Sequence, residues 1–152
     1  EQLDALLGPI RAKSRELDAQ AGRNVPLLVK IAPDMSEEEV ALVAGSIARN
    51  ELDGVIATNT TVSRDAVSDD PQAQEAGGLS GKPVFEASNT VIRLLRAHLP
   101  TLPIIGVGGI DSGEAAKAKI AAGADLVQLY SGLIYQGPAL VQQCAKALKQ
   151  GE

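Results

Sequence analysis

The stretch PIIGVGGIDSGE, residues 103–114, decides the fold class of this chain. The run PIIGVGGI is apolar and too short for a helix, so it predicts a buried strand that ends in glycines. Asp111 follows as a helix N-cap, with Glu114 three residues further on, which is the spacing of a capping box. The segment AAKAKIAAG then predicts a short helix. A strand, a glycine turn and a helix in this order indicate an α/β protein.

The same order of strand and helix extends to both sides of this stretch. Ser36 and Glu39 have the spacing of another capping box, and Gly22 is typical of a helix end. Helices are expected at residues 1–21, 36–50, 84–95, 115–123 and 137–150, and further apolar strands at residues 26–31, 53–61 and 124–132. Residues 61–82 interrupt the pattern with a long, polar, acidic loop, and loops of this length are usually functional or disordered.

Strands that are apolar on both faces and alternate with helices predict a parallel sheet covered by helices. Four strands cannot close a barrel, and so small an open sheet leaves two bare edges. A doubly wound fold would carry its glycine turn after the first strand, whereas here the glycines follow the third. Glycines after a late strand are typical of a (β/α)8 TIM barrel, whose phosphate site lies after strands seven and eight. We therefore predict that residues 1–152 are the last four β/α units of such a barrel, without its N-terminal half.

The composition narrows the classes of function. The chain has 152 residues, of which 45% are hydrophobic and 22% charged, and this balance is typical of a globular domain. A net charge of −5 and only three aromatic residues argue against a nucleic-acid partner. No apolar run approaches the roughly 20 residues of a transmembrane helix. The single cysteine favours a reducing compartment, and a chain that begins inside a helical pattern suggests a fragment.

Polar or glycine residues stand at the ends of all four predicted strands. These segments are Lys30, residues 58–61, residues 106–109 and residues 130–132. Because the carboxyl ends of parallel strands meet at one face of a barrel, we expect the four segments to converge on one site.

Each segment also has a simpler interpretation. Lys30 lies in an otherwise apolar strand, where burial of an ammonium without an anion is costly. Its side chain either reaches solvent or pairs with a structural carboxylate, or it lies beside an anionic ligand. Residues 58–61 form either a hydroxyl-rich turn or a surface that recognises a planar polar ring. The two glycine clusters either permit tight turns or present backbone N–H groups to a phosphate. We expect His98 at a helix end and Cys144 in the core, and no metal site.

Five motifs together, LLVKIAPDMS, DGVIATNTT, GGLSGKP, IIGVGGIDS and GADLVQLYSG, resemble the second half of class 2 dihydroorotate dehydrogenases. The similarity covers nearly the whole chain and is weakest in residues 62–76. The resemblance implies oxidation of dihydroorotate to orotate with FMN in pyrimidine biosynthesis, with a membrane quinone as electron acceptor.

The same resemblance implies roles for eight residues. Those expected to bind FMN are Lys30, Thr58, Gly81, Gly109, Tyr130 and Ser131, and those expected to bind the substrate are Asn59 and Thr60. The catalytic base of the class is a serine that would lie upstream of this chain, so no catalytic residue is expected here and the isolated chain is expected to be inactive.

The resemblance also implies partners and a location. The expected partners are the N-terminal half-barrel and, through that missing region, a membrane quinone, with the intact enzyme peripheral on the inner (cytoplasmic or mitochondrial) membrane. Two alternatives stay open. One is a soluble class 1 dihydroorotate dehydrogenase that uses fumarate or NAD, and the other is a catalytically silent half-barrel with a structural or interaction role.

Overall fold

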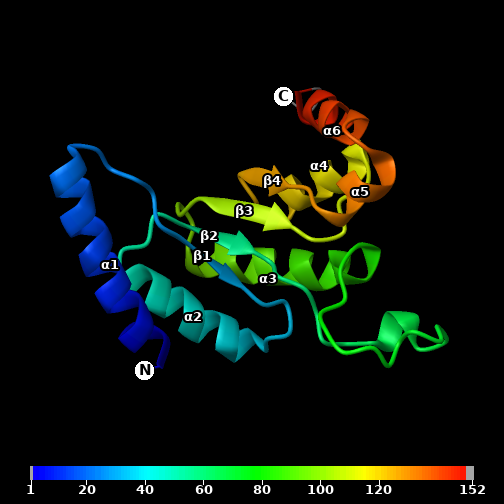
Figure 1. Cartoon of the computed structure of the whole chain (residues 1–152), viewed down its shortest axis with the longest axis horizontal. Helices are drawn as coiled ribbons and strands as arrows, with labels where there is room; N and C mark the ends of the chain where they lie inside the picture. The colour runs from blue at the N-terminus through cyan, green and yellow to red at the C-terminus, as the bar shows by residue number, and fades with distance from the viewer. Residues whose placement is uncertain (1, 150–152) are drawn as a thin grey trace.

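A computed structural model gives the fold of the chain and describes residues 2–149 (Figure 1). Helices and strands alternate, as the sequence predicts. The helices are α1 (Gln2–Ala21), α2 (Glu37–Arg49), α3 (Phe85–His98), α4 (Gly113–Ala121), α5 (Ser131–Gln136) and α6 (Ala139–Lys149), with short 3-10 helices η1 (Asp65–Val67) and η2 (Lys82–Val84). The strands are β1 (Leu28–Ile31), β2 (Gly54–Ala57), β3 (Ile104–Val107) and β4 (Leu126–Gln128). Residues 1 and 150–152 lie outside the described residues, and with them the first residue of the predicted helix 1–21 and the last residue of the predicted helix 137–150.

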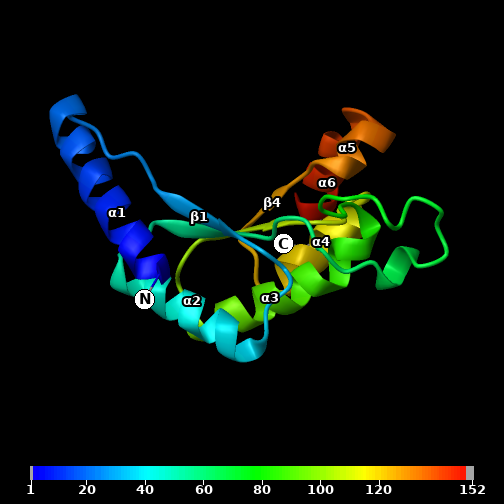
Figure 2. The same ribbon diagram turned by 60° about the horizontal axis from the view of Figure 1, so that its bottom comes forward.

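The four strands form one parallel sheet in the order β1-β2-β3-β4. Helices α2, α3 and α4 cover one face of the sheet, and the other face is open between α1 on one side and α5 and α6 on the other (Figure 2). A curved parallel sheet with helices on its outer face is the architecture of a (β/α)8 barrel wall. Within residues 2–149, no helix is both long and apolar enough to cross a membrane.

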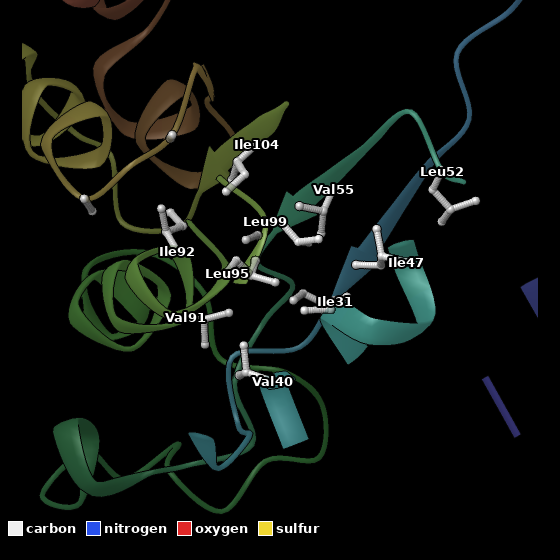
Figure 3. Packing of buried hydrophobic residues seen from close by; sticks show 14 of the residues in the cluster. Ile31, Val40, Ile47, Leu52, Val55, Val91, Ile92, Leu95, Leu99 and Ile104 are labelled. Carbon is white, nitrogen blue, oxygen red and sulfur yellow. The ribbon is translucent and has the colours of Figure 1, made fainter. Parts of the chain in front are cut away.

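The core lies between the sheet and its helices. Val55 and Ile104 are fully buried there and pack with Ile47 of α2 and Leu95 of α3 (Figure 3). The residues of the open face are more accessible, and Leu126 is 60% exposed. The predicted burial holds for the central strands β2 and β3, whereas β1 and β4 are more exposed, because helices cover only one face of the sheet.

The predicted N-cap is correct for α2 but not for α4. Ser36 caps α2 and forms the predicted capping box with Glu39. The predicted cap at Asp111 is wrong. Ser112 is the N-cap of α4, where its side chain accepts a hydrogen bond from the N–H of Ala115 at 3.2 Å. Asp111 is instead drawn into an ion pair with Lys82, 2.9 Å away.

The end of the chain also differs from its prediction. The apolar run at residues 124–132 contains a strand of only three residues, β4, and the helix α5 begins already at Ser131. Gly137, with φ of 71°, then separates α5 from α6. Cys144 is buried in the core, as predicted, and burial raises the pKa of its thiol.

The long loop between β2 and α3 is organised by backbone contacts. Thr61 and Leu79 form an antiparallel bridge that closes it. Inside the loop, the Arg64 guanidinium donates hydrogen bonds to six carbonyl oxygens. These belong to Thr61, Val62, Ser63, Ala73, Glu75 and Gly77. A single side chain therefore ties together residues 61–77.

The amino ends of the strands carry a repeated arrangement of aspartates. Asp53, just before β2, accepts two hydrogen bonds from Arg11 at 2.8 and 3.1 Å and one from the N–H of Leu27 at 2.7 Å. Asp125, just before β4, accepts from Arg96 at 2.6 Å and from the first N–H of β3 at 2.7 Å. Each aspartate thus joins a guanidinium to the start of a neighbouring strand segment.

Candidate functional site

A cavity of about 290 Å³ lies at the carboxyl ends of the strands. It brings together all eight residues that the resemblance singled out. They are Lys30, Thr58, Asn59, Thr60, Gly81, Gly109, Tyr130 and Ser131. Strand β1 contributes Lys30, and the segments that follow β2, β3 and β4 contribute the rest, as expected for the ligand-binding face of a barrel.

Lys30 stands near the end of β1 on the open face of the sheet. Its side chain is exposed, and within the described residues its Nζ has no hydrogen-bond or ion-pair partner. Of the alternatives left open for Lys30, pairing with a structural carboxylate does not occur within the described residues, and the ammonium is exposed because no helix covers this face. The structure leaves a free cation beside the cavity.

The end of β2 presents an amide and a hydroxyl. Thr58 is buried, and its N–H donates to the carbonyl of Val107 at 2.9 Å. The N–H of Asn59 donates to the carbonyl of Ile31 at 2.7 Å. The side chains of Asn59 and Thr60 are exposed, and neither makes a hydrogen bond within the part of the chain that is described. The backbone here is fixed while these polar side chains remain available to a ligand.

The glycines after β3 are required by their surroundings. Gly109 has φ of 70°, and a Cβ added to it would lie 2.6 Å from Cβ of Phe85 and 3.1 Å from the carbonyl oxygen of Gly81. A side chain therefore cannot stand at this position without displacing the start of η2 and α3. The N–H groups of Gly109 and Ile110 have no acceptor among residues 2–149.

The start of α5 packs against this glycine turn. A Cβ on Gly132 would overlap the carbonyl oxygen of Ile110, so the two backbones touch. The first N–H groups of a helix have no intrahelical partner, which leaves those of Ser131 and Gly132 free beside the turn. Ser131 Oγ hydrogen-bonds Ser80 Oγ at 2.9 Å, which connects α5 to the long loop. Free backbone N–H groups from two neighbouring strand ends form a concave surface that suits an anion.

Two features of the site were missed from the sequence. Gln128 also lines the cavity, and its signal was a polar residue in the apolar run of residues 124–132. Lys119 of α4 is fully buried behind the glycine turn, where its Nζ lies 4.7 Å from the centroid of the Phe85 ring and donates to the Phe85 carbonyl at 3.3 Å. Burial lowers the pKa of Lys119 to about 8.

Tyr130 lines the cavity and is 74% exposed. His98 is exposed in the last turn of α3, as predicted. No group of three or more His, Cys, Asp or Glu side chains that could hold a metal ion occurs among residues 2–149.

Comparisons with known proteins identify the family of the chain. The sequence model of the dihydroorotate dehydrogenase family matches residues 6–151. Proteins named dihydroorotate dehydrogenase (quinone) from Burkholderia mallei (strain SAVP1) and Burkholderia pseudomallei (strain K96243) are 60% identical over 99% of this chain. The chain spans 44% of the length of these relatives.

Solved structures give the same result. The chain superposes on DHODH from Eimeria tenella in complex with ferulenol with a TM-score of 0.89 and 29% identity, covering 96% of this chain and 43% of that one. A ligand-free form from the same organism gives 0.78 and 36% identity, over 84% of this chain and 35% of that one. The predicted fold class, the last four β/α units of a (β/α)8 barrel, is confirmed. The chain belongs to the dihydroorotate dehydrogenase family.

Proposed function

We propose that this chain is one half of a single FMN-binding barrel domain in a dihydroorotate dehydrogenase that passes electrons to a quinone. The observation that carries the proposal is the cavity that gathers all eight residues implied by the family resemblance. In a chain 60% identical to proteins named dihydroorotate dehydrogenase (quinone), these residues are best interpreted as a cofactor and substrate site.

The cofactor part of the site fits the phosphate of FMN. Free N–H groups at Gly109, Ile110, Ser131 and Gly132 supply donors to phosphate oxygens without a side chain in the way. Lys30 lies on the same cavity, where its ammonium would stabilise negative charge on a reduced flavin ring. Thr58 and Gly81 would line the cofactor between these two ends.

The substrate part of the site is the segment that follows β2. The Asn59 amide and the Thr60 hydroxyl offer both donors and acceptors, which suits the edge of a pyrimidine ring that bears carbonyl and N–H groups. FMN, when bound, supplies the chemistry that accepts a hydride from the substrate. The residues of this chain bind and orient the reactants, and the proton is taken by a serine of the other half-barrel.

The electron acceptor distinguishes this proposal from the first alternative, a soluble class 1 enzyme. The related proteins carry the word quinone in their names, which favours a quinone over the fumarate or NAD of soluble class 1 enzymes. A quinone acceptor places the intact enzyme on the surface of the inner membrane, where such lipids dissolve. The second alternative is a catalytically silent half-barrel. It does not explain why unpaired polar groups lie together at one cavity.

A full-length enzyme that contains this segment tests the proposal directly. Purified protein should hold one FMN per chain and reduce a soluble ubiquinone analogue when dihydroorotate is added. Fumarate and NAD should give little turnover. The isolated 152-residue chain should give none, because the base lies elsewhere. A colourless full-length protein, or one that prefers fumarate or NAD, would contradict the proposal.

A further inference from the structure

We propose that Asp34 is a positioning residue that holds the substrate segment Asn59-Thr60 in place from the neighbouring loop. The inference rests on the proposed function and adds to it a residue that does not line the cavity. Asp34 lies after β1, four residues beyond Lys30, and contacts the chain immediately after the substrate segment.

The carboxylate of Asp34 binds two consecutive residues of the neighbouring loop. One oxygen accepts a hydrogen bond from the Thr61 hydroxyl, and the other accepts from the N–H of Val62 at 2.9 Å. A carboxylate that accepts from two donors forms charge-assisted hydrogen bonds, which are shorter and stronger than neutral ones. Thr61 is itself buried, so its hydroxyl needs this partner.

Thr61 is also held from its other side. Its N–H donates to the Leu79 carbonyl at 3.0 Å, and its carbonyl accepts from the Leu79 N–H at 2.8 Å. Next to Leu79, the backbone of Gly78 lies so close to Thr60 that an added Cβ would overlap the Thr60 hydroxyl. The Thr60 side chain is thus packed against backbone from the returning end of the loop.

The substrate segment therefore lies between two fixed points. At its start, the N–H of Asn59 donates to the Ile31 carbonyl at 2.7 Å, and directly after it Thr61 is held by Asp34. The side chains of Asn59 and Thr60 have no partner of their own within residues 2–149. Their orientation consequently depends on the backbone, and Asp34 fixes the downstream end of that backbone. Loss of this contact should weaken substrate binding and leave the phosphate site intact.

The experiment uses a full-length FMN-loaded enzyme that contains this segment. Asp34→Ala should raise KM for dihydroorotate about tenfold, with kcat changed by less than about twofold and FMN content unchanged. Asp34→Asn should lie between wild type and alanine, since the amide keeps one acceptor oxygen. Thr61→Val should raise KM through the same contact, so combining it with Asp34→Ala should add little. Asp70→Ala is the matched control, because Asp70 also accepts a backbone N–H in this loop, from Gln72 at 2.8 Å.

The outcomes separate this inference from the function on which it rests. Wild-type oxidation of dihydroorotate with a selective rise in KM in the Asp34 and Thr61 variants supports both. Wild-type turnover with an unchanged KM in Asp34→Ala overturns the inference and leaves the proposed function standing. An equal rise in KM in Asp70→Ala, or a change confined to melting temperature or FMN content, also overturns it. A wild-type enzyme that does not oxidise dihydroorotate overturns both.

Discussion

The polar groups at the amino ends of the strands have hydrogen-bond partners, whereas many at the carboxyl ends have none within residues 2–149. At the amino ends, Asp53 and Asp125 each engage both a guanidinium and a backbone N–H. At the carboxyl ends, Lys30, Asn59 and Thr60 have side chains without partners among the described residues, and the glycine turn after β3 leaves N–H groups free. We interpret the polar groups that gather on one cavity without partners as the proposed ligand site. The amino ends serve stability.

The largest expected effect is that of Lys30 in a full-length enzyme. Lys30→Ala should slow flavin reduction about a hundredfold or more, by analogy with the loss of one oxyanion donor, about 2.7–4 kcal/mol. It should also lower the flavin midpoint potential and weaken FMN retention, and Lys30→Arg should rescue only in part. Stopped-flow reduction and a redox titration measure both effects.

Lys13→Ala is the control for Lys30, because Lys13 is a solvent-exposed lysine of α1 that does not line the cavity. Its removal should leave the reduction rate unchanged. If Lys30→Ala leaves the rate of flavin reduction and the flavin midpoint potential unchanged, the carboxyl ends of the strands do not have the functional role proposed for Lys30.

The next effect concerns stability at the other end. Asp53→Ala should lower the free energy of unfolding by about 2–3 kcal/mol, because it leaves the largely buried Arg11 and the Leu27 N–H without their acceptor. Urea denaturation measures this loss, and kcat/KM of the folded enzyme should not change. Arg11 holds the pKa of Asp53 below its ordinary value of 3.8, so this stability is present at neutral pH and is lost as pH falls below that value. A fall in kcat/KM with an unchanged free energy of unfolding in Asp53→Ala would contradict the stabilising role assigned to the amino ends of the strands.

Asn59 gives a smaller effect at the carboxyl end. Asn59→Ala should reduce kcat/KM for dihydroorotate about tenfold to a hundredfold, since unpaired polar atoms of a buried substrate cost about 1–3 kcal/mol. FMN content should remain that of wild type. Asn24→Ala, at an exposed position in the loop before β1, is the control and should be silent. Wild-type kinetics in the Asn59 variant would indicate that residues 58–61 form only a turn and do not bind the substrate.

The smallest expected effect belongs to Lys119, a buried charge behind the site. Burial lowers its pKa to about 8, a shift that Glu86 opposes and Arg93 assists. At pH 7 the amine is charged in both the folded and the unfolded chain, so the full cost of burial is present there. Between pH 8 and 10.5 the unfolded chain binds more protons, and wild-type stability should rise with pH.

Lys119→Met should therefore raise the free energy of unfolding at pH 7 by about 1 kcal/mol, after the lost contacts with Phe85 are subtracted. The gap to wild type should narrow above pH 8. Urea titrations at pH 7 and pH 10 measure it, with the partly exposed Lys117→Met as control. A gap that widens with pH would show that the buried ammonium is net stabilising.

Sequence patterns were sufficient where structure depends on neighbours along the chain. The Ser36 and Glu39 capping box formed as predicted, and Gly22 has the positive φ expected of a helix end. The convergence of the four strand ends followed from parallel topology alone. These features need no knowledge of distant contacts.

Sequence patterns failed where a distant residue decides the outcome. Asp111 lost its predicted cap role to an ion pair with Lys82, 29 positions earlier. No local pattern marks Lys119 as buried, because its partner is the carbonyl and ring of Phe85, 34 positions earlier. The Asp34 contact with Thr61 likewise joins two separate loops.

The Arg64 side chain gives the long loop a property that its sequence does not suggest. Because one guanidinium contacts six carbonyls between residues 61 and 77, these residues should exchange their amide hydrogens and become accessible to proteases together. The loop then behaves as a local cooperative unit that opens and closes while the sheet stays folded. The bridge from Thr61 to Leu79 belongs to the same unit and lies next to the cavity. Binding of a ligand in the cavity should therefore slow the exchange of amide hydrogens in residues 61–77, including those distant from the cavity.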